Sequence, residues 1–229
     1  MINHHINFVR IKSVANAFNK LNEKVVFVGG ATVSLYPDMP VSEVRPTDDI
    51  DVIVEILNFN DRVELENRLR EIGFENDIES GIICRYKING IIVDIMPTND
   101  ISIGFTNIWY QDGFQNAIEY TLENVKIRIL TASYFIATKL EAFKGRGNND
   151  GRFSTDFEDI IHVLENRSTV WLEIQSAPKD LKNYLQIEFQ TLLENKNLPE
   201  WIDCHIERGI SPSTLKIINQ MKQFVSFDQ

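Results

Sequence analysis

The chain has 229 residues and a mass of 26.4 kDa, and its 43% hydrophobic and 24% charged residues are typical of globular proteins. This composition excludes a disordered or collagenous chain, and no apolar run reaches the ~18 residues of a membrane span. The first residues lack the pattern of a secretory signal, so we expect a cytoplasmic protein with no membrane partner. Cys84 and Cys204 form no disulfide framework, and we expect reduced thiols in the core.

Charge is unevenly distributed along the chain. The net charge of −10 and the pI of about 4.9 disfavour passive adhesion to nucleic acid or to anionic membranes. The segment from Lys126 to Arg152 departs from this, because it holds six basic residues against two acidic ones. Such a segment is typical either of a phosphate site or of a solvated helix with its loop.

The first part of the chain has the pattern of an α/β unit. Apolar spacing and turn residues predict a helix over 14–21, a buried strand over 24–28 ending at Gly29-Gly30, a helix start over 31–36, a strand over 49–56 and a helix over 61–72. Asn89-Gly90 separates two apolar runs, 82–88 and 91–96, and this is a strong hairpin signal. A weaker strand pair follows over 117–122 and 125–129.

The rest of the chain is predicted to be helical. A helix is expected over 131–143, a Gly- and Asn-rich loop over 145–152, and further helices over 154–165, 179–194, 201–207 and 212–224. The sequence therefore predicts an α/β region over residues 1–130 and an all-helical region over residues 131–229.

Acidic residues in two predicted strands carry the first chemical signal. Asp49 and Asp51 are two residues apart on a strand, so both carboxylates point to one face. Two such acids repel one another unless a cation lies between them, and their oxygens suit Mg²⁺ or Mn²⁺. A solvated strand face is the alternative interpretation.

Asp94 is the third acid. It lies in the apolar run 91–96, where an unpaired carboxylate is costly to bury. If the hairpin joins the same sheet as Asp49 and Asp51, the three carboxylates form a two-metal site. The alternative is a salt bridge at a sheet edge with a residue such as Arg85.

Gly29-Gly30, between a strand and a helix start, supplies a tight turn with backbone N–H groups suited to phosphate, although the pair also occurs in ordinary turns. The order of these features resembles the polymerase-β-like nucleotidyltransferase superfamily. In particular, the chain is similar to the AbiEii/AbiGii-type and MenT-like toxin branch over residues 25–165. The segments that carry this resemblance are Val28–Leu35, Arg45–Val52, Thr138–Ala142 and Thr155–Ile160.

The resemblance implies an α+β fold, in which a small mixed β-sheet core with flanking helices is followed by a C-terminal helical bundle that completes a cleft. It implies a site for Mg²⁺ or Mn²⁺ formed by the catalytic carboxylates Asp49, Asp51 and Asp94, with Asp94 helping to deprotonate the acceptor. It also implies a site for a nucleoside triphosphate, with ATP among the candidates, formed by Gly29, Gly30, Thr32, Arg45, Lys139 and Asp156.

Several positions leave alternatives open. The turn reads Gly-Gly-Ala-Thr where the family often has Gly-Gly-Thr-Ala. Thr155 precedes Asp156 at a position where the family has a basic residue, and Arg152 is the candidate to replace that charge. Arg45 either contacts phosphate or braces its loop. Lys139 either contacts the triphosphate or extends from an apolar helix to the surface.

The leading hypothesis is a metal-dependent nucleotidyltransferase that transfers NMP from an NTP to an acceptor hydroxyl and releases pyrophosphate. The resemblance implies a toxin that acts on tRNA and has a cognate antitoxin. Alternatives are the same reaction on a small molecule, as in aminoglycoside nucleotidyltransferases, or on a protein hydroxyl. A non-catalytic binding module or antitoxin is a further alternative, but such a domain need not keep three costly acids.

Overall fold

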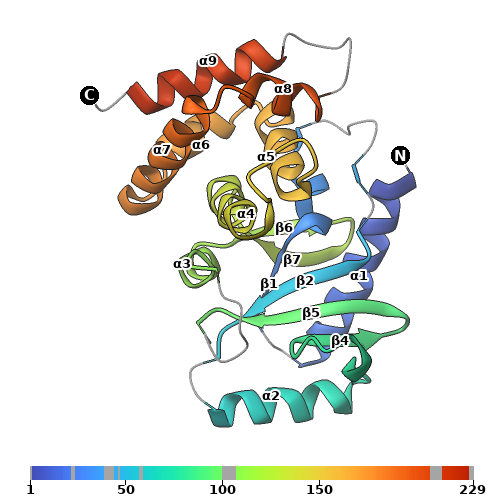
Figure 1. Ribbon diagram of the computed structural model, residues 1–229. Helices are drawn as coiled ribbons and strands as arrows, with labels where there is room; N and C mark the ends of the chain where they lie inside the picture. The colour runs from blue at the N-terminus through green and yellow to red at the C-terminus, as the bar shows by residue number, and fades with distance from the viewer. Residues whose placement is uncertain are drawn as a thin grey trace. The chain divides into compact units, whose positions relative to one another are not determined.

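The computed structural model describes residues 2–21, 24–38, 44–45, 47–56, 59–99, 107–206 and 213–226. The chain divides into two compact units, shown in Figure 1. The first unit comprises Met1–Ser34 and Val41–Thr131, and the second comprises Leu35–Pro40 and Ala132–Gln229. A mixed sheet with flanking helices is followed by a helical C-terminal part, which confirms the predicted α+β fold.

The first unit contains a sheet in which the seven described strands have the order β3-β4-β5-β2-β1-β7-β6. The strand bounds are β1 Val25–Val28, β2 Asp49–Val54, β3 Glu75–Asn76, β4 Arg85–Ile88, β5 Ile91–Pro97, β6 Ile118–Leu122 and β7 Val125–Ile129. Strand β2 pairs in parallel with β5 and antiparallel with β1, while β1 pairs in parallel with β7. The sheet is therefore mixed, and β5, β2 and β1 lie in its interior.

The predicted hairpin is confirmed. Asn89 and Gly90 connect β4 to β5 and have φ values of 52° and 77°, so both lie in the left-handed region that a two-residue type I′ turn requires. The turn fixes the register of the two strands and places Arg85 directly opposite Asp94.

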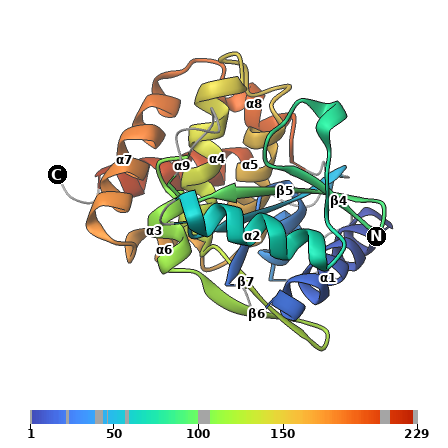
Figure 2. The same ribbon diagram turned by 90° about the horizontal axis from the view of Figure 1, so that it is seen from below.

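Side chains of the interior strands alternate between two different faces of the sheet. One face carries Ile50, Val52, Tyr86 and Val93, all buried, and is covered by the helices α1 (Ile2–Leu21) and α2 (Phe59–Glu71). Ring contacts lead from Phe18 of α1 through Phe74 to Tyr86 of β4. Helix α2 lies below the strands in Figure 1 and in front of them in Figure 2. The opposite face carries the aspartates of β2 and β5.

The segment after β1 forms a 3₁₀ helix, η1 (Gly30–Leu35), where the sequence predicted the start of an α-helix. The N–H of Thr32 donates to the carbonyl oxygen of Gly29 at 3.2 Å, which is the three-residue spacing of a 3₁₀ turn. Other short elements escaped prediction because they are too short to show a period: η2 (Ile78–Ser80), α3 (Tyr110–Gln115), α6 (Val170–Gln175) and strand β3.

The second unit is helical. Its helices are α4 (Ala132–Arg146), α5 (Thr155–Asn166), α6, α7 (Lys179–Glu194), α8 (Leu198–Asp203) and α9 (Ser213–Ser226). Helix α4 continues into the predicted loop, and Pro212, the predicted first residue of the last helix, lies outside the described residues. Aromatic rings form two clusters in its core, Phe143 with Phe157 and Trp201, and Trp171 with Phe189 and Phe224.

Within the described ranges, no helix combines the length and the apolar character needed to cross a membrane. Both cysteines are free thiols. Cys204 is exposed and Cys84 is only partly buried, so the expectation of two core thiols is wrong. Cys204 directly follows the short helix α8, whose inward-facing positions are occupied by the larger Trp201 and Ile202.

Candidate functional site

The three predicted carboxylates lie on one face of two neighbouring strands. Asp51 of β2 and Asp94 of β5 are direct partners in the parallel register, and residues opposite one another in a sheet point to the same face. Asp49 is two residues before Asp51 and shares that face. We refer to Asp49, Asp51 and Asp94 as the carboxylate site.

Arg85 of β4 lies among these acids. Its Nε donates to Asp94 Oδ1 at 2.8 Å, and its Nη2 donates to Asp94 Oδ2 at 2.7 Å and to Asp49 Oδ2 at 3.0 Å. The sequence offered a salt bridge with Arg85 as the alternative to a shared acidic site. The structure shows the salt bridge, and it includes Asp49 as well as Asp94.

The electrostatics of this region are dominated by negative charge. The hydrogen bonds that Arg85 donates to Asp94 and the negative charges of all three aspartates raise the pKa of the Arg85 guanidinium, and outweigh the opposing effect of burial. Burial raises the pKa of the neighbouring Cys84 thiol, and the charges of Asp94 and Asp51 raise it further. The carboxylate site is therefore a place where a cation is stabilised.

The glycine turn touches the carboxylate site. Gly29 has a φ of +72°, and a Cβ atom there would lie 1.9 Å from Asp51 Oδ2. Asp51 can approach the backbone this closely only because Gly29 has no side chain and adopts a left-handed conformation. The glycine turn and the acidic strand, which follow one another in the sequence, are thus in direct contact through Gly29 and Asp51.

Arg45 packs against the same turn. A Cβ atom on Gly30 would lie 2.1 Å from Nη2 of the half-buried Arg45, so the guanidinium rests on the glycine. Thr47 of the same segment donates a hydrogen bond to the buried Asn7 at 3.1 Å. Gly29, Gly30 and Arg45 are therefore brought together with Asp51 in the first unit.

Thr32 is oriented differently. Its hydroxyl donates to the Gly29 carbonyl oxygen at 2.9 Å and its residue is only 1% exposed. In this arrangement the Thr32 side chain braces the glycine turn from within.

The remaining predicted nucleotide residues lie in the second unit. The Lys139 ammonium forms ion pairs with Asp156 at 3.0 Å and Asp159 at 2.6 Å, and all three side chains are buried. Arg146 adds two hydrogen bonds to Asp156, at 2.7 and 2.8 Å. We refer to Lys139, Arg146, Asp156 and Asp159 as the ion cluster. Lys139 does not extend to the surface, because burial in this cluster gives its charge two partners.

Burial alone would raise the pKa of Asp156, but hydrogen bonds from Arg146 and the charge of Lys139 hold it below its ordinary value. Arg152, the candidate for the missing basic partner, pairs instead with Asp150 and Glu200. Arg146, at the end of α4, takes that position.

The carboxylate site offers the hard oxygen donors that Mg²⁺ and Mn²⁺ prefer. Arg85 forms ion pairs with both Asp49 and Asp94, so at least two of the three acids can contact one cation. As the side chains lie, no group of three or more His, Cys, Asp or Glu residues within the described ranges is arranged to hold a metal ion. The oxygen donors of Asp49, Asp51 and Asp94 are chemically suited to a divalent ion. In this arrangement Asp49 and Asp94 are paired with Arg85 instead.

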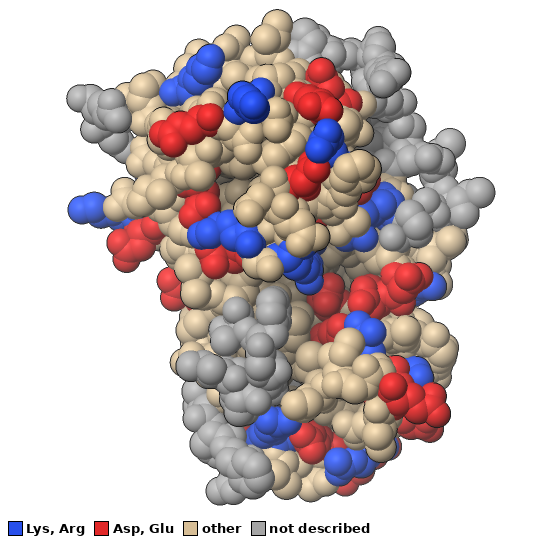
Figure 3. All heavy atoms as spheres, in the orientation of Figure 1, with Lys and Arg blue, Asp and Glu red and all other residues tan. Residues whose placement is uncertain are grey.

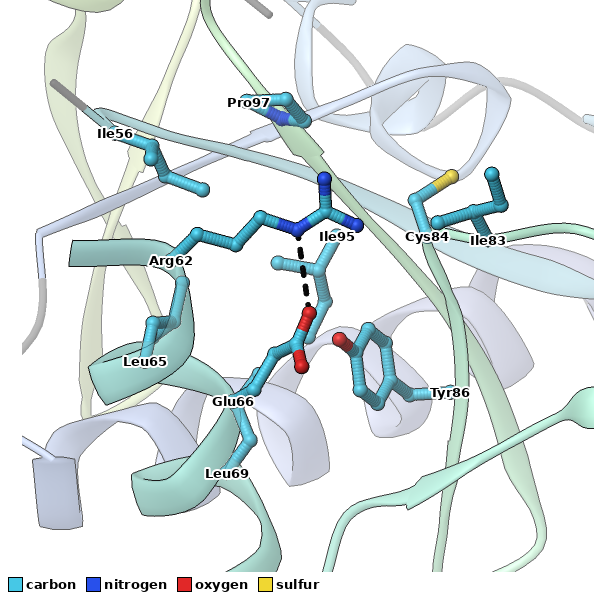
Figure 4. Close-up of a pocket in the computed structure, with 10 residues that line it drawn as sticks. All are labelled: Ile56, Arg62, Leu65, Glu66, Leu69, Ile83, Cys84, Tyr86, Ile95 and Pro97. Carbon is cyan, nitrogen blue, oxygen red and sulfur yellow. Dashed lines mark hydrogen bonds and ion pairs between the residues drawn. The ribbon is translucent and has the colours of Figure 1, made fainter. Parts of the chain in front are cut away.

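A small cavity lies on the covered face of the sheet, between α2 and strands β4 and β5, shown in Figure 4. Its lining includes Leu65, Leu69, Tyr86 and Ile95. Its volume of about 20 Å³ suits roughly one water molecule and is far too small for a nucleotide. The aspartates lie on the other face, so this cavity is separate from the carboxylate site.

Basic and acidic side chains are interspersed over the described part of the face shown in Figure 3. A broad single-sign area of the kind that binds nucleic acid backbones is not seen on that part of the surface.

The fold is that of nucleotidyltransferase-like proteins. The crystal structure of an antigenic nucleotidyltransferase-like protein from Paracoccidioides brasiliensis aligns with 88% of this chain and 94% of its own, at a TM-score of 0.52 and 17% identity. The solution structure of the antibiotic-resistance factor ANT(2'')-Ia, described as revealing substrate-regulated conformation dynamics, aligns with 82% of this chain and 95% of its own, at a TM-score of 0.52 and 16% identity. The chain matches no protein-family model and no curated protein.

Arg146 and Asp159 were not predicted to belong to a candidate site, and Arg85 was considered only as the salt-bridge alternative for Asp94. Arg85 could have been assigned from the sequence, because a two-residue Asn-Gly turn places it opposite Asp94. Arg146 gives no comparable signal, since its contact with Asp156 depends on how α4 and α5 pack.

Proposed function

We propose that this protein is a metal-dependent nucleotidyltransferase that transfers NMP from an NTP to an acceptor hydroxyl and releases pyrophosphate. The observation that carries the proposal is the position of Asp51 opposite Asp94, with Asp49 on the same face and Gly29 against Asp51. The fold similarity supports the same class of reaction.

Asp49, Asp51 and Asp94 would hold Mg²⁺ or Mn²⁺. Such an ion would neutralise charge on the triphosphate and lower the pKa of an acceptor hydroxyl. In the proposed reaction the acceptor oxygen forms a bond to the α-phosphorus, the bond from that phosphorus to pyrophosphate breaks, and a carboxylate oxygen of Asp94 accepts the hydroxyl proton.

Phosphate binding is assigned to the glycine turn. Gly29 and Gly30 would present backbone N–H groups, with Thr32 bracing the turn and the Arg45 guanidinium adding positive charge. Lys139 and Asp156 remain proposed nucleotide residues, and their participation would require part of the ion cluster to rearrange.

We propose a small molecule as the acceptor. A net charge of −10 and the interspersed charges in Figure 3 offer little support for a long RNA footprint. The fold similarity to an antibiotic-resistance factor favours a small hydroxyl compound. A tRNA acceptor with a cognate antitoxin, and a protein hydroxyl, are the alternatives that the same assay tests.

The test is a transfer assay with each of the four NTPs labelled at the α-phosphate, in Mg²⁺ or Mn²⁺. Separate reactions contain aminoglycosides, total RNA or total protein as acceptors. We expect label on a small-molecule acceptor, with Asp94→Asn abolishing transfer. Asp48→Asn is the matched control, because Asp48 is the exposed neighbour of Asp49 in the sequence and lies before the strand.

Label on RNA or protein would support the reaction and reject the small-molecule acceptor. Transfer that survives in Asp94→Asn would reject the catalytic assignment. Wild-type protein that binds no NTP and labels no acceptor would support a non-catalytic binding module.

A further inference from the structure

Arg85 is a positive charge that the carboxylate site already holds. Both oxygens of Asp94 and one oxygen of Asp49 accept hydrogen bonds from the same guanidinium. The contact with Asp94 is a bidentate salt bridge, which is a strong geometry for an arginine and a carboxylate.

The pair is largely withdrawn from water. The side chains of Arg85 and Asp94 are 19% and 13% exposed, and that of Asp49 is 35% exposed. Charges in such a place interact more strongly than charges on an open surface. Without Arg85, Asp49 and Asp94 would lose the cation that they share, and their carboxylates would repel one another.

A divalent ion would need the same oxygens. It would also be repelled by a guanidinium that stayed within hydrogen-bonding distance of Asp94. Arg85 and a divalent ion therefore compete for the same oxygens of the carboxylate site.

We propose that Arg85 is an internal counter-ion that exchanges with the divalent metal ion. In the metal-free protein it holds Asp49 and Asp94 together, and on metal binding it releases Asp94. Arg85 acts here as a positioning residue that sets metal affinity. The inference rests on the proposed function, because it assumes that the carboxylate site binds metal.

The experiment compares wild type, Arg85→Gln and Lys87→Gln by Mn²⁺ titration, with free Mn²⁺ measured by electron paramagnetic resonance, and by thermal unfolding in EDTA and in Mn²⁺. Lys87 is the matched control because it lies two residues along the same strand and pairs with Asp77 at 2.8 Å. We expect Arg85→Gln to bind Mn²⁺ at least ~10-fold more tightly than wild type, since a charge-assisted hydrogen bond no longer has to be broken.

In EDTA, Arg85→Gln should unfold at a lower temperature than wild type, and Mn²⁺ should raise its unfolding temperature by more than it raises that of wild type. Lys87→Gln should bind Mn²⁺ with the affinity of wild type. If Arg85→Gln is unfolded in EDTA and folds in Mn²⁺, the exchange is supported. Arg85→Lys is a second variant, which keeps the positive charge but cannot form the bidentate contact. Its Mn²⁺ affinity should lie between those of wild type and Arg85→Gln.

Equal Mn²⁺ affinity in wild type, Arg85→Gln and Arg85→Lys would overturn the exchange while leaving the proposed function in place. Failure of every variant to bind Mn²⁺, with and without NTP, would overturn the proposed function together with the exchange.

Discussion

Asp51 and Asp94 lie directly opposite one another on the neighbouring parallel strands β2 and β5, although they are 43 positions apart in the sequence. Each strand carries aliphatic side chains toward the helix-covered face and its aspartate toward the other. At this level of the two strands the pairing places charge on one face and core side chains on the other. Two residues farther along, the same face as the aspartates carries the buried pair Ile53 and Met96.

Gly29→Ala should disturb Asp51. The new methyl group would meet Asp51 Oδ2 at 1.9 Å, and the φ of +72° is unfavourable for alanine. Gly81→Ala is the control, because Gly81 has a φ of +70° with no neighbouring atom within 4 Å. Both variants should lose ~1–2 kcal/mol of unfolding free energy from the left-handed backbone. Gly29→Ala should lose a further ~1–3 kcal/mol from the clash, as measured by urea unfolding. Equal losses would contradict the close approach of Asp51.

Asp156→Asn should destabilise the protein in a pH-dependent way. The pKa of Asp156 is lowered in the folded state, so its ionised form stabilises the fold above the unfolded pKa of about 3.9. This contribution is lost as the pH falls through the lower, folded pKa. The difference in unfolding free energy between wild type and Asp156→Asn should be ~3 kcal/mol at pH 7 and should shrink toward pH 2. Asp180→Asn, at an exposed position, should show little difference at either pH. A difference that does not change with pH would rule out this role for the carboxylate.

Lys139→Met should leave Asp156 and Asp159 without their shared cation. Removing one partner of a buried pair costs about 3–5 kcal/mol, whereas a surface pair contributes about 0–1 kcal/mol. Lys144→Met is the control, since Lys144 pairs with Glu141 and Glu188 and its side chain is 47% exposed. In urea unfolding, Lys139→Met should therefore lose more unfolding free energy than Lys144→Met, by at least ~2 kcal/mol.

The same two variants test the nucleotide role of Lys139. Calorimetric titration with NTP, at a temperature where both variants are folded, should show weaker binding by Lys139→Met than by Lys144→Met. If both bind NTP as wild type does, Lys139 serves the stability of the ion cluster and is no part of the nucleotide site.

Cys84 should report on the charge of the carboxylate site. Burial raises the pKa of its thiol, and Asp94 and Asp51 raise it further, so alkylation should require a higher pH than it does for an ordinary thiol. In a Cys204→Ser background, Asp94→Asn should shift the pH profile of Cys84 alkylation to lower pH. Asp48→Asn should leave the profile in place. An unchanged profile in Asp94→Asn would mean that the carboxylate does not act on the thiol.

Local sequence determined much of the carboxylate site. The two-residue spacing of Asp49 and Asp51 put both on one strand face, because side chains alternate in a strand. Asn89-Gly90 fixed the hairpin, since only residues tolerant of positive φ form its turn, and the hairpin in turn sets Arg85 opposite Asp94. These features depend on contacts between near neighbours in the chain.

Tertiary structure decided the rest. The parallel pairing of β2 with β5, and hence the meeting of Asp51 and Asp94, joins distant segments whose register is set by burial of the helix-covered face. The partners of Lys139 depend on the packing of α4 against α5, which brings Asp156 and Asp159 to one ammonium. Local propensity carries no information on such pairings, because their free energy comes from surfaces that exist only once the elements have packed together.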